Sequence, residues 1–215
     1  MGGTAATKPR RLRSDAALNQ QRIYAAAHRL LGENGVDITL DEVAQLAGVG
    51  IGTIYRRYAN KQELIAQVQR QYVEEFAAAI ELASANPDSW QGLRQLLEYA
   101  GQQVANSRAY CELLSRVREG TKLFDFIQKS IDEPLTMLLG RAKESGHLRP
   151  DVEASDIYTI IIMIGPVVAL THTAQQNNWR RYLALTLDGI CATTTPRRPL
   201  SPAPLSITDL FRPET

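Results

Sequence analysis

Apolar residues recur at every third or fourth position along most of this chain, from Asp15 to about Ala192. That spacing is typical of amphipathic helices, and no stretch shows the strict apolar–polar alternation that is typical of strands. The sequence therefore predicts an all-α fold of about nine helices. Its 215 residues, of which 44% are hydrophobic, are enough for one or two domains.

Local signals place the boundaries of the helices. Asn34-Gly35 ends a first helix that begins at Asp15. Thr39 and Glu42 match a capping box at the start of a second helix, which Gly48 ends. After a short third helix, Asn60 caps a long fourth one. The third helix is expected over about 51–58, and the five helices after the fourth over about 89–106, 108–118, 121–145, 154–176 and 178–192.

Both ends of the chain lack helical periodicity. Residues 1–14 hold four basic and no acidic residues, and are expected to form a disordered basic arm. Residues 193–215 hold five of the ten prolines, and are expected to form a disordered Pro/Thr-rich tail. Whether its ITDLF stretch docks on the body stays open. Between the ends, we expect one domain over 15–60 and another over 61–192.

Few features of the sequence point to catalysis. Neither Cys111 nor Cys191 has a metal-binding or redox spacing, and the three histidines are isolated. With no paired carboxylates and no Ser/His/Asp set, we expect no enzyme activity, cofactor or metal. The longest apolar run, 157–170, has fourteen residues, whereas a membrane span needs roughly 18–20. No signal peptide is visible, so we expect a cytoplasmic protein without a membrane partner.

Charge and glycine spacing favour nucleic-acid binding. Residues 1–61 carry a net charge of +4 and the remainder −3, a modest footprint for a polyanion. Gly48, Gly50 and Gly52 could belong to a phosphate-cradling nucleotide loop, but such a loop needs a preceding strand. In a helix-turn-helix over about 39–58, they would end one helix, cap the next and lie in its first turn. A helical hairpin with a merely polar face remains the alternative.

The stretch Asn19–Leu64 closely resembles the DNA-binding domain of TetR-type (tetracycline-repressor-like) regulators. The resemblance rests on AAAHRLLGENG, TLDEVAQLAGV, GTIYRRY and NKQEL, one in each of four successive helices. It implies an N-terminal three-helix helix-turn-helix domain and a C-terminal helical domain for ligand binding and dimerisation. The positions that it places at DNA phosphates or base edges are Thr39, Gly50, Ile51, Gly52, Thr53, Tyr55, Arg56, Arg57 and Lys61.

Two of these positions depart from the usual pattern of the family. Gly50 stands where many members have Ser, and Ile51 replaces a commonly polar or basic residue. Isoleucine cannot hydrogen-bond a base, but it can pack on a thymine methyl. We therefore expect base readout to use Arg56 or Arg57 together with apolar contact at a thymine.

The resemblance also implies a homodimer that binds a palindromic operator in double-stranded DNA and releases it when a small-molecule effector binds. We expect a ligand-responsive repressor, cytoplasmic and nucleoid-associated when bound to DNA; a helical protein-interaction adaptor with a vestigial DNA-binding head is the alternative. The candidate dimer faces could also be intramolecular core. Ligand-pocket candidates are Phe76, Leu97, Tyr110, Phe124, Ile127, Met163 and His172. Dimer candidates are Ile160, Ile164, Val167, Trp179, Tyr182, Leu183 and Leu187.

Overall fold

The computed structural model describes residues 8–107, 110, 117, 120–171, 177–193 and 198–206, with side chains from residue 16 onward except residue 171. Within these residues the chain folds into helices and contains no strand, so the predicted all-α class is confirmed. It divides into two compact units, residues 1–68 and 69–215. This boundary falls inside the fourth helix rather than at its start, where we expected it.

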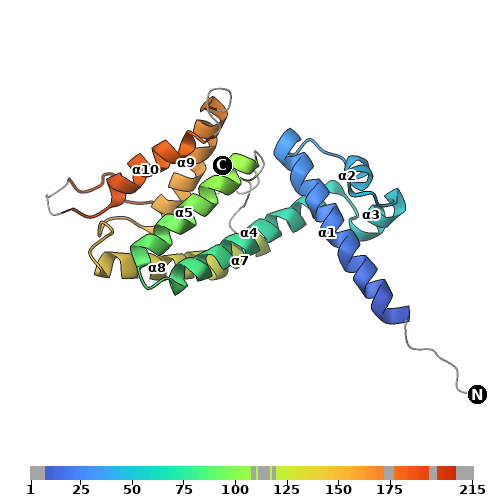
Figure 1. Cartoon of the computed structure of the whole chain (residues 1–215), viewed down its shortest axis with the longest axis horizontal. Helices are drawn as coiled ribbons and strands as arrows, with labels where there is room; N and C mark the ends of the chain where they lie inside the picture. Colours follow the sequence, from blue (N-terminus) through green and yellow to red (C-terminus); the bar gives the residue numbers. More distant parts are fainter. Residues whose placement is uncertain are drawn as a thin grey trace, which may run out of the picture. The chain divides into compact units, whose positions relative to one another are not determined.

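The first unit groups three helices with the start of a fourth (Figure 1). These are α1 (Lys8–Asn34), α2 (Leu40–Ala47), α3 (Ile51–Arg57) and the first turns of α4 (Lys61–Ala85). Its core is apolar, and burial of each large aliphatic side chain stabilises the unit by about 1.5–3 kcal/mol. The fully buried side chains include Ile23, Leu31, Ile38, Val43, Ile54, Leu64 and Val68.

Helix α1 begins at Lys8, seven residues earlier than expected. The second half of the expected disordered arm is therefore helical. Pro9 lies in the first turn, where a missing backbone N–H leaves no intrahelical hydrogen bond unmade. The basic residues that follow are good helix formers. Residues 1–7 lie outside the described residues.

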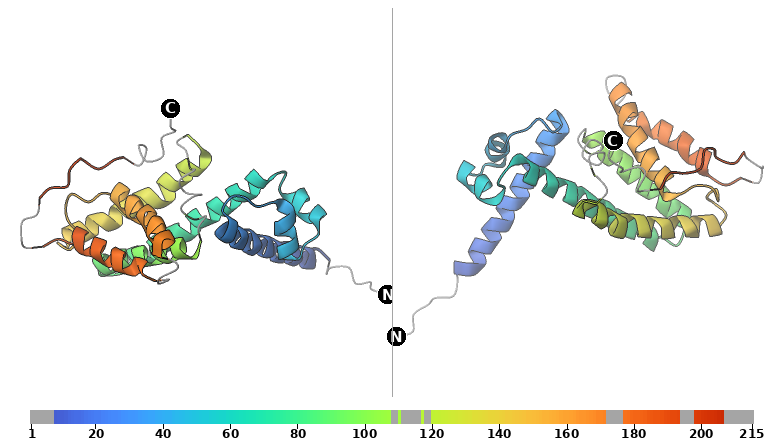
Figure 2. Two further views of the ribbon diagram at one scale, coloured as in Figure 1. Left: turned by 90° about the horizontal axis from the view of Figure 1, so that it is seen from above. Right: turned by 180° about the vertical axis from the view of Figure 1, so that it is seen from behind.

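The second unit consists of the rest of α4 and a further set of helices. They are α5 (Ser89–Asn106), α7 (Lys122–Ile127), the π-helical segment η1 (Gln128–Asp132), α8 (Glu133–Glu144), α9 (Ala154–Thr171) and α10 (Trp179–Ile190). Helices α5, α9 and α10 lie side by side (Figure 2). The helix expected over 108–118 lies outside the described residues, apart from residues 110 and 117. No described helix is long and apolar enough to span a membrane.

Helices α5 and α10 approach each other closely at a glycine. A Cβ atom added to Gly101 would overlap Cζ3 of the fully buried Trp179 ring. Beside this contact, Arg180 donates hydrogen bonds to Glu98 Oε1 at 2.5 Å and to Gln102 Oε1 at 2.7 Å. The Arg180 guanidinium also lies 4.5 Å from the centre of the Trp179 ring. The packing of α5 against α10 therefore combines the buried Trp179 ring with the hydrogen bonds of Arg180 to two residues of α5.

Part of the C-terminal tail is held by the loop before α9. Arg149 and Asp151 form two hydrogen bonds, at 2.9 and 2.8 Å. Arg149 also donates to the carbonyl of Arg198, and the Leu200 N–H donates to Asp151 Oδ2, both at 2.9 Å. The tail that we expected to be disordered is thus docked at 198–200 through its backbone. The ITDLF stretch, 207–211, lies outside the described residues.

Candidate nucleic-acid interface

The turn between α2 and α3 uses the three glycines as predicted. Gly48 ends α2 with a φ of 64°, a left-handed conformation that glycine adopts without a steric penalty. Gly50 is the N-cap of α3, and its carbonyl accepts the Thr53 N–H at 2.7 Å, but it has no side chain to cap the helix. Gly52 lies in the first turn, and no atom lies within 4 Å of a Cβ added there.

Helix α3 presents most of the expected DNA-binding residues around one buried residue. Ile54 is completely buried, and Tyr58 at the C-cap is almost so. The remaining positions of the helix are exposed or half-buried. They are Ile51, Gly52, Thr53, Tyr55, Arg56 and Arg57.

The two arginines of α3 have different partners. Arg56 Nη2 donates a hydrogen bond to Thr53 Oγ1 at 3.1 Å. The guanidinium carbon of Arg57 instead lies 5.9 Å from the centre of the Tyr58 ring. The sequence alone left the two arginines equivalent, whereas the structure gives them different surroundings.

Tyr55 lies beside a carboxylate of the preceding helix. The negative charge of Asp41 on α2, followed by burial and a hydrogen bond to Asp41, raises the pKa of Tyr55. The single phenol proton is engaged by Asp41, so a phosphate contact by Tyr55 requires it to leave that carboxylate. Sequence reasoning missed Asp41, because its proximity depends on how α2 packs against α3.

Thr39 forms the predicted capping box at the start of α2. Its hydroxyl donates to Glu42 Oε2 at 2.9 Å and accepts the Glu42 N–H at 3.2 Å, while its own N–H donates to Glu42 Oε2 at 2.7 Å. These hydrogen bonds lower the pKa of Glu42. The hydroxyl proton is thus engaged, and a phosphate contact by Thr39 requires it to leave Glu42.

Lys61, the first residue of α4, reaches back to the loop after α1. Its Nζ donates to the carbonyl of Val36 at 3.1 Å. Because an ammonium group has three N–H donors, this bond leaves capacity for a phosphate. The predicted cap of α4 is also present: Asn60 Oδ1 accepts the Glu63 N–H at 3.0 Å.

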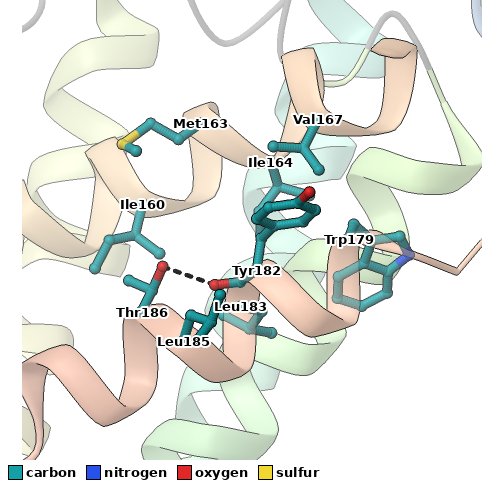
Figure 3. A pocket seen from close by; sticks show the side chains of 9 residues that line it. All are labelled: Ile160, Met163, Ile164, Val167, Trp179, Tyr182, Leu183, Leu185 and Thr186. Carbon is teal, nitrogen blue, oxygen red and sulfur yellow. Dashed lines mark hydrogen bonds between the residues drawn. The ribbon is translucent and has the colours of Figure 1, made fainter. Parts of the chain in front are cut away.

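The second unit has an apolar groove between α9 and α10, of about 270 Å³ (Figure 3). Met163, Leu185 and Tyr182 are 59%, 58% and 44% exposed along it. Thr186 donates its hydroxyl hydrogen to the Tyr182 carbonyl at 2.9 Å, the dashed line in Figure 3. The groove is lined by Ile160, Met163, Ile164, Val167, Trp179, Tyr182, Leu183, Leu185 and Thr186.

The expected dimer residues divide between this surface and the core. Ile160, Val167 and Tyr182 are exposed or half-buried. The other four are buried within their own unit, although Ile164, Trp179 and Leu183 also line the groove. These buried residues are Ile164, Trp179, Leu183 and Leu187.

The expected ligand-pocket residues also divide. Five of them are buried in the second unit, namely Phe76, Leu97, Tyr110, Phe124 and Ile127. Met163 differs from these five, because it is exposed and lines the α9–α10 groove. His172 lies outside the described residues.

The second unit buries several polar groups whose burial the sequence pattern did not predict. Within the described part of the chain, the Ser155 hydroxyl and the Trp179 indole nitrogen are buried without a hydrogen-bond partner. Burial raises the pKa of Asp132 in η1; burial, and next the charge of Asp132, raise the pKa of Tyr158. Among the residues that the structure describes, no group of three His, Cys, Asp or Glu side chains could hold a metal ion.

A helix-turn-helix with an exposed Thr/Tyr/Arg helix, followed by an all-helical unit, defines a DNA-binding regulator. Comparison with known families agrees. Residues 23–68 match the family of bacterial regulatory proteins called tetR, and residues 91–192 match the C-terminal domain of SbtR-like transcriptional regulators. The chain belongs to the TetR family of transcriptional regulators.

Three individual proteins that this chain resembles each share less than 30% of its residues. An HTH-type transcriptional regulator of Staphylococcus aureus (strain USA300) is 28% identical over 126 residues, 58% of this chain and 66% of that protein, just under two thirds of its length. The crystal structure of a TetR regulatory protein from Mycobacterium vanbaalenii is 23% identical, with a TM-score of 0.60 over 84% of this chain and 99% of that one. FadR from Bacillus subtilis, solved with stearoyl-CoA, is 18% identical, with a TM-score of 0.60 over 80% and 99%. The solved structures share the fold.

Proposed function

We propose that this chain is a ligand-responsive repressor that binds a palindromic operator as a homodimer and leaves it when a small-molecule effector binds. The observation that carries the proposal is the exposure of Tyr55, Arg56 and Arg57 around buried Ile54 on α3. Such a helix has hydrogen-bond donors for phosphates and base edges on its outer side. It acts in the bacterial cytoplasm, at the nucleoid, and without catalysis.

The α9–α10 groove supports dimerisation. Contiguous exposed apolar surface marks interaction sites, and here Met163, Tyr182 and Leu185 supply it. A second copy would fill the groove with its own side chains. A two-fold dimer can then present two α3 helices to half-sites about 34–36 Å apart, or a multiple of that distance.

The interior of the second unit supports an effector with a large apolar part. The predicted pocket residues Phe76, Leu97 and Phe124 are apolar and buried there. An effector releases DNA only if it binds the DNA-incompetent state more tightly. Coupling of about 1–3 kcal/mol would weaken DNA binding by about 5–150-fold. Stearoyl-CoA, bound by FadR of Bacillus subtilis, is a reasonable first compound to test.

A mobility-shift assay tests the proposal. The full chain is titrated against the duplex upstream of its own gene and against a scrambled duplex of equal length and composition. We expect tighter binding to the upstream duplex, as a complex of two chains. Equal binding to both duplexes, or none, would favour the adaptor alternative. A complex that persists with every effector candidate, including stearoyl-CoA, would argue against ligand release.

A further inference from the structure

Arg56 and Arg57 are adjacent in sequence but lie on different sides of α3. Successive residues of an α-helix are separated by about 100° around the axis. Relative to buried Ile54, Arg56 is therefore about 160° away and Arg57 only about 60° away. Arg56 lies on the outward side of the helix. Arg57 lies toward the packed side, where its guanidinium lies near the Tyr58 ring.

The Arg56 side chain is directed toward the beginning of the helix. Side chains in α-helices lean toward the N-terminus, over the residues one turn back. Its hydrogen bond to Thr53 Oγ1, 3.1 Å long, holds the guanidinium there. One residue further back, Gly52 has no side chain, and the space around a Cβ added there is open. Since the first residues of a recognition helix meet the base edges, nothing on α3 separates this guanidinium from a base.

The chemistry of the group selects one base. A guanidinium has five N–H donors and no acceptor, so the bond to Thr53 leaves donors for a second partner. In the major groove guanine presents two adjacent acceptors, N7 and O6, whereas adenine pairs its N7 acceptor with a donor. Thr53 accepts the bond from Arg56 and keeps its own hydroxyl proton for a phosphate. A phosphate contact by Thr53 would therefore fix the arginine further.

We propose that Arg56 reads a guanine in each half-site, that Thr53 is its positioning residue, and that Arg57 contacts the DNA backbone without selecting a base. This inference rests on the proposed DNA-binding function and specifies how that site discriminates. It also assigns different roles to two arginines that the sequence alone could not separate.

The full chain is first used to select the duplexes that it binds from a randomised library, and these duplexes serve as the probe. Affinities are then measured for the enriched duplex and for versions with each G·C pair changed to A·T. We expect one guanine per half-site whose preference falls in Arg56→Lys, which keeps the charge but loses the planar fork, and falls by about 5–150-fold in Arg56→Ala. Arg57→Lys is the matched control and keeps that preference. Arg57→Ala should also keep it, while the slope of log affinity against log salt becomes shallower by about 0.9 for each phosphate that the variant no longer neutralises.

Two further experiments test the role of guanine N7 and of the Thr53 hydroxyl. Replacing that guanine by 7-deazaguanine removes N7, and should weaken the wild-type complex much more than the Arg56→Lys complex. Thr53→Val should reduce the guanine preference, and Thr53→Ser should restore it because the hydroxyl returns. The inference is overturned if Arg56→Lys retains the wild-type preference, or if Arg57→Lys is the variant that loses it. If the wild-type chain enriches no sequence at all, the proposed function itself fails.

Discussion

Tyr55 combines an exposed ring with a hydroxyl that lies beside Asp41, whose charge raises the pKa of the phenol. On DNA, the hydrogen bond of the phenol can be transferred from this carboxylate partner to a phosphate oxygen as its acceptor. We expect Tyr55→Phe to weaken operator binding roughly tenfold, because a hydrogen bond to a charged group is lost while the ring remains. Fluorescence anisotropy with the selected duplex measures the loss. Tyr99→Phe on α5 is the control, and equal affinities of both variants would exclude Tyr55 from the interface.

Ile51 is an apolar residue at a position that we expect to meet base edges, and it is 57% exposed. If it packs on a thymine methyl, replacing that thymine by uracil should weaken the wild-type complex about fourfold, since burying one methyl contributes about 0.8 kcal/mol. Ile51→Ala should bind the two duplexes equally. A titration of both proteins with both duplexes measures this coupling. A uracil effect of the same size in Ile51→Ala would show that the methyl contacts another group.

At the scale of the element, the sequence predicted what depends on near neighbours. The caps of α2 and α4 were predictable, because Thr39 and Asn60 each pair with a residue three positions later. The inward face of α9 was not, since apolar residues surround that helix. On α10 the apolar face is wider than the part that is buried. Trp179 and Tyr182 are only about 60° apart around α10, yet one is buried and the other exposed. Only the packing of α5 against α10 distinguishes them.

That packing predicts a specific sensitivity at Gly101. A methyl group there would overlap Cζ3 of the Trp179 ring. We expect Gly101→Ala to lower the free energy of unfolding by about 1–3 kcal/mol through overpacking. Gly140→Ala in α8 is the control, because nothing lies within 4 Å of its added Cβ. It should raise stability, as alanine favours helices. Urea unfolding compares the two, and equal stabilities would contradict the packing at Gly101.

The tail-docking contacts between Arg149, Asp151 and Leu200 predict a pH dependence. Hydrogen bonds from Arg149, and next from the Leu200 N–H, hold the pKa of Asp151 well below its ordinary value of 3.8. Because the folded pKa is lowered, this contribution is fully present above pH 3.8 and is lost only as the pH falls toward the lower folded value. Hydrogen exchange at the Leu200 amide should thus show protection at neutral pH that Asp151→Asn weakens. If wild type and variant exchange equally fast, the tail is not held by this carboxylate.

At the scale of the whole molecule, the proposed DNA recognition by the seven-residue α3 requires two copies of the chain. A helix of this length can make few base contacts, whereas a dimer links two half-sites and multiplies their affinities. We expect Met163→Glu and Leu185→Glu to shift the chain from dimer to monomer, because each places a charge in the apolar α9–α10 groove. Leu82→Glu on α4 is the control, since Leu82 is 76% exposed but lies outside that groove.

Size-exclusion chromatography with light scattering measures the masses, and anisotropy measures binding to the full operator and to a single half-site. The groove variants should lose affinity for the full operator while binding a single half-site as well as wild type does, because their α3 helices are unchanged. The Leu82 variant should remain dimeric and bind both duplexes normally. Dimers of the groove variants at wild-type concentrations would place the interface elsewhere. Monomers that still bind the full operator tightly would show that pairing on DNA does not require this face.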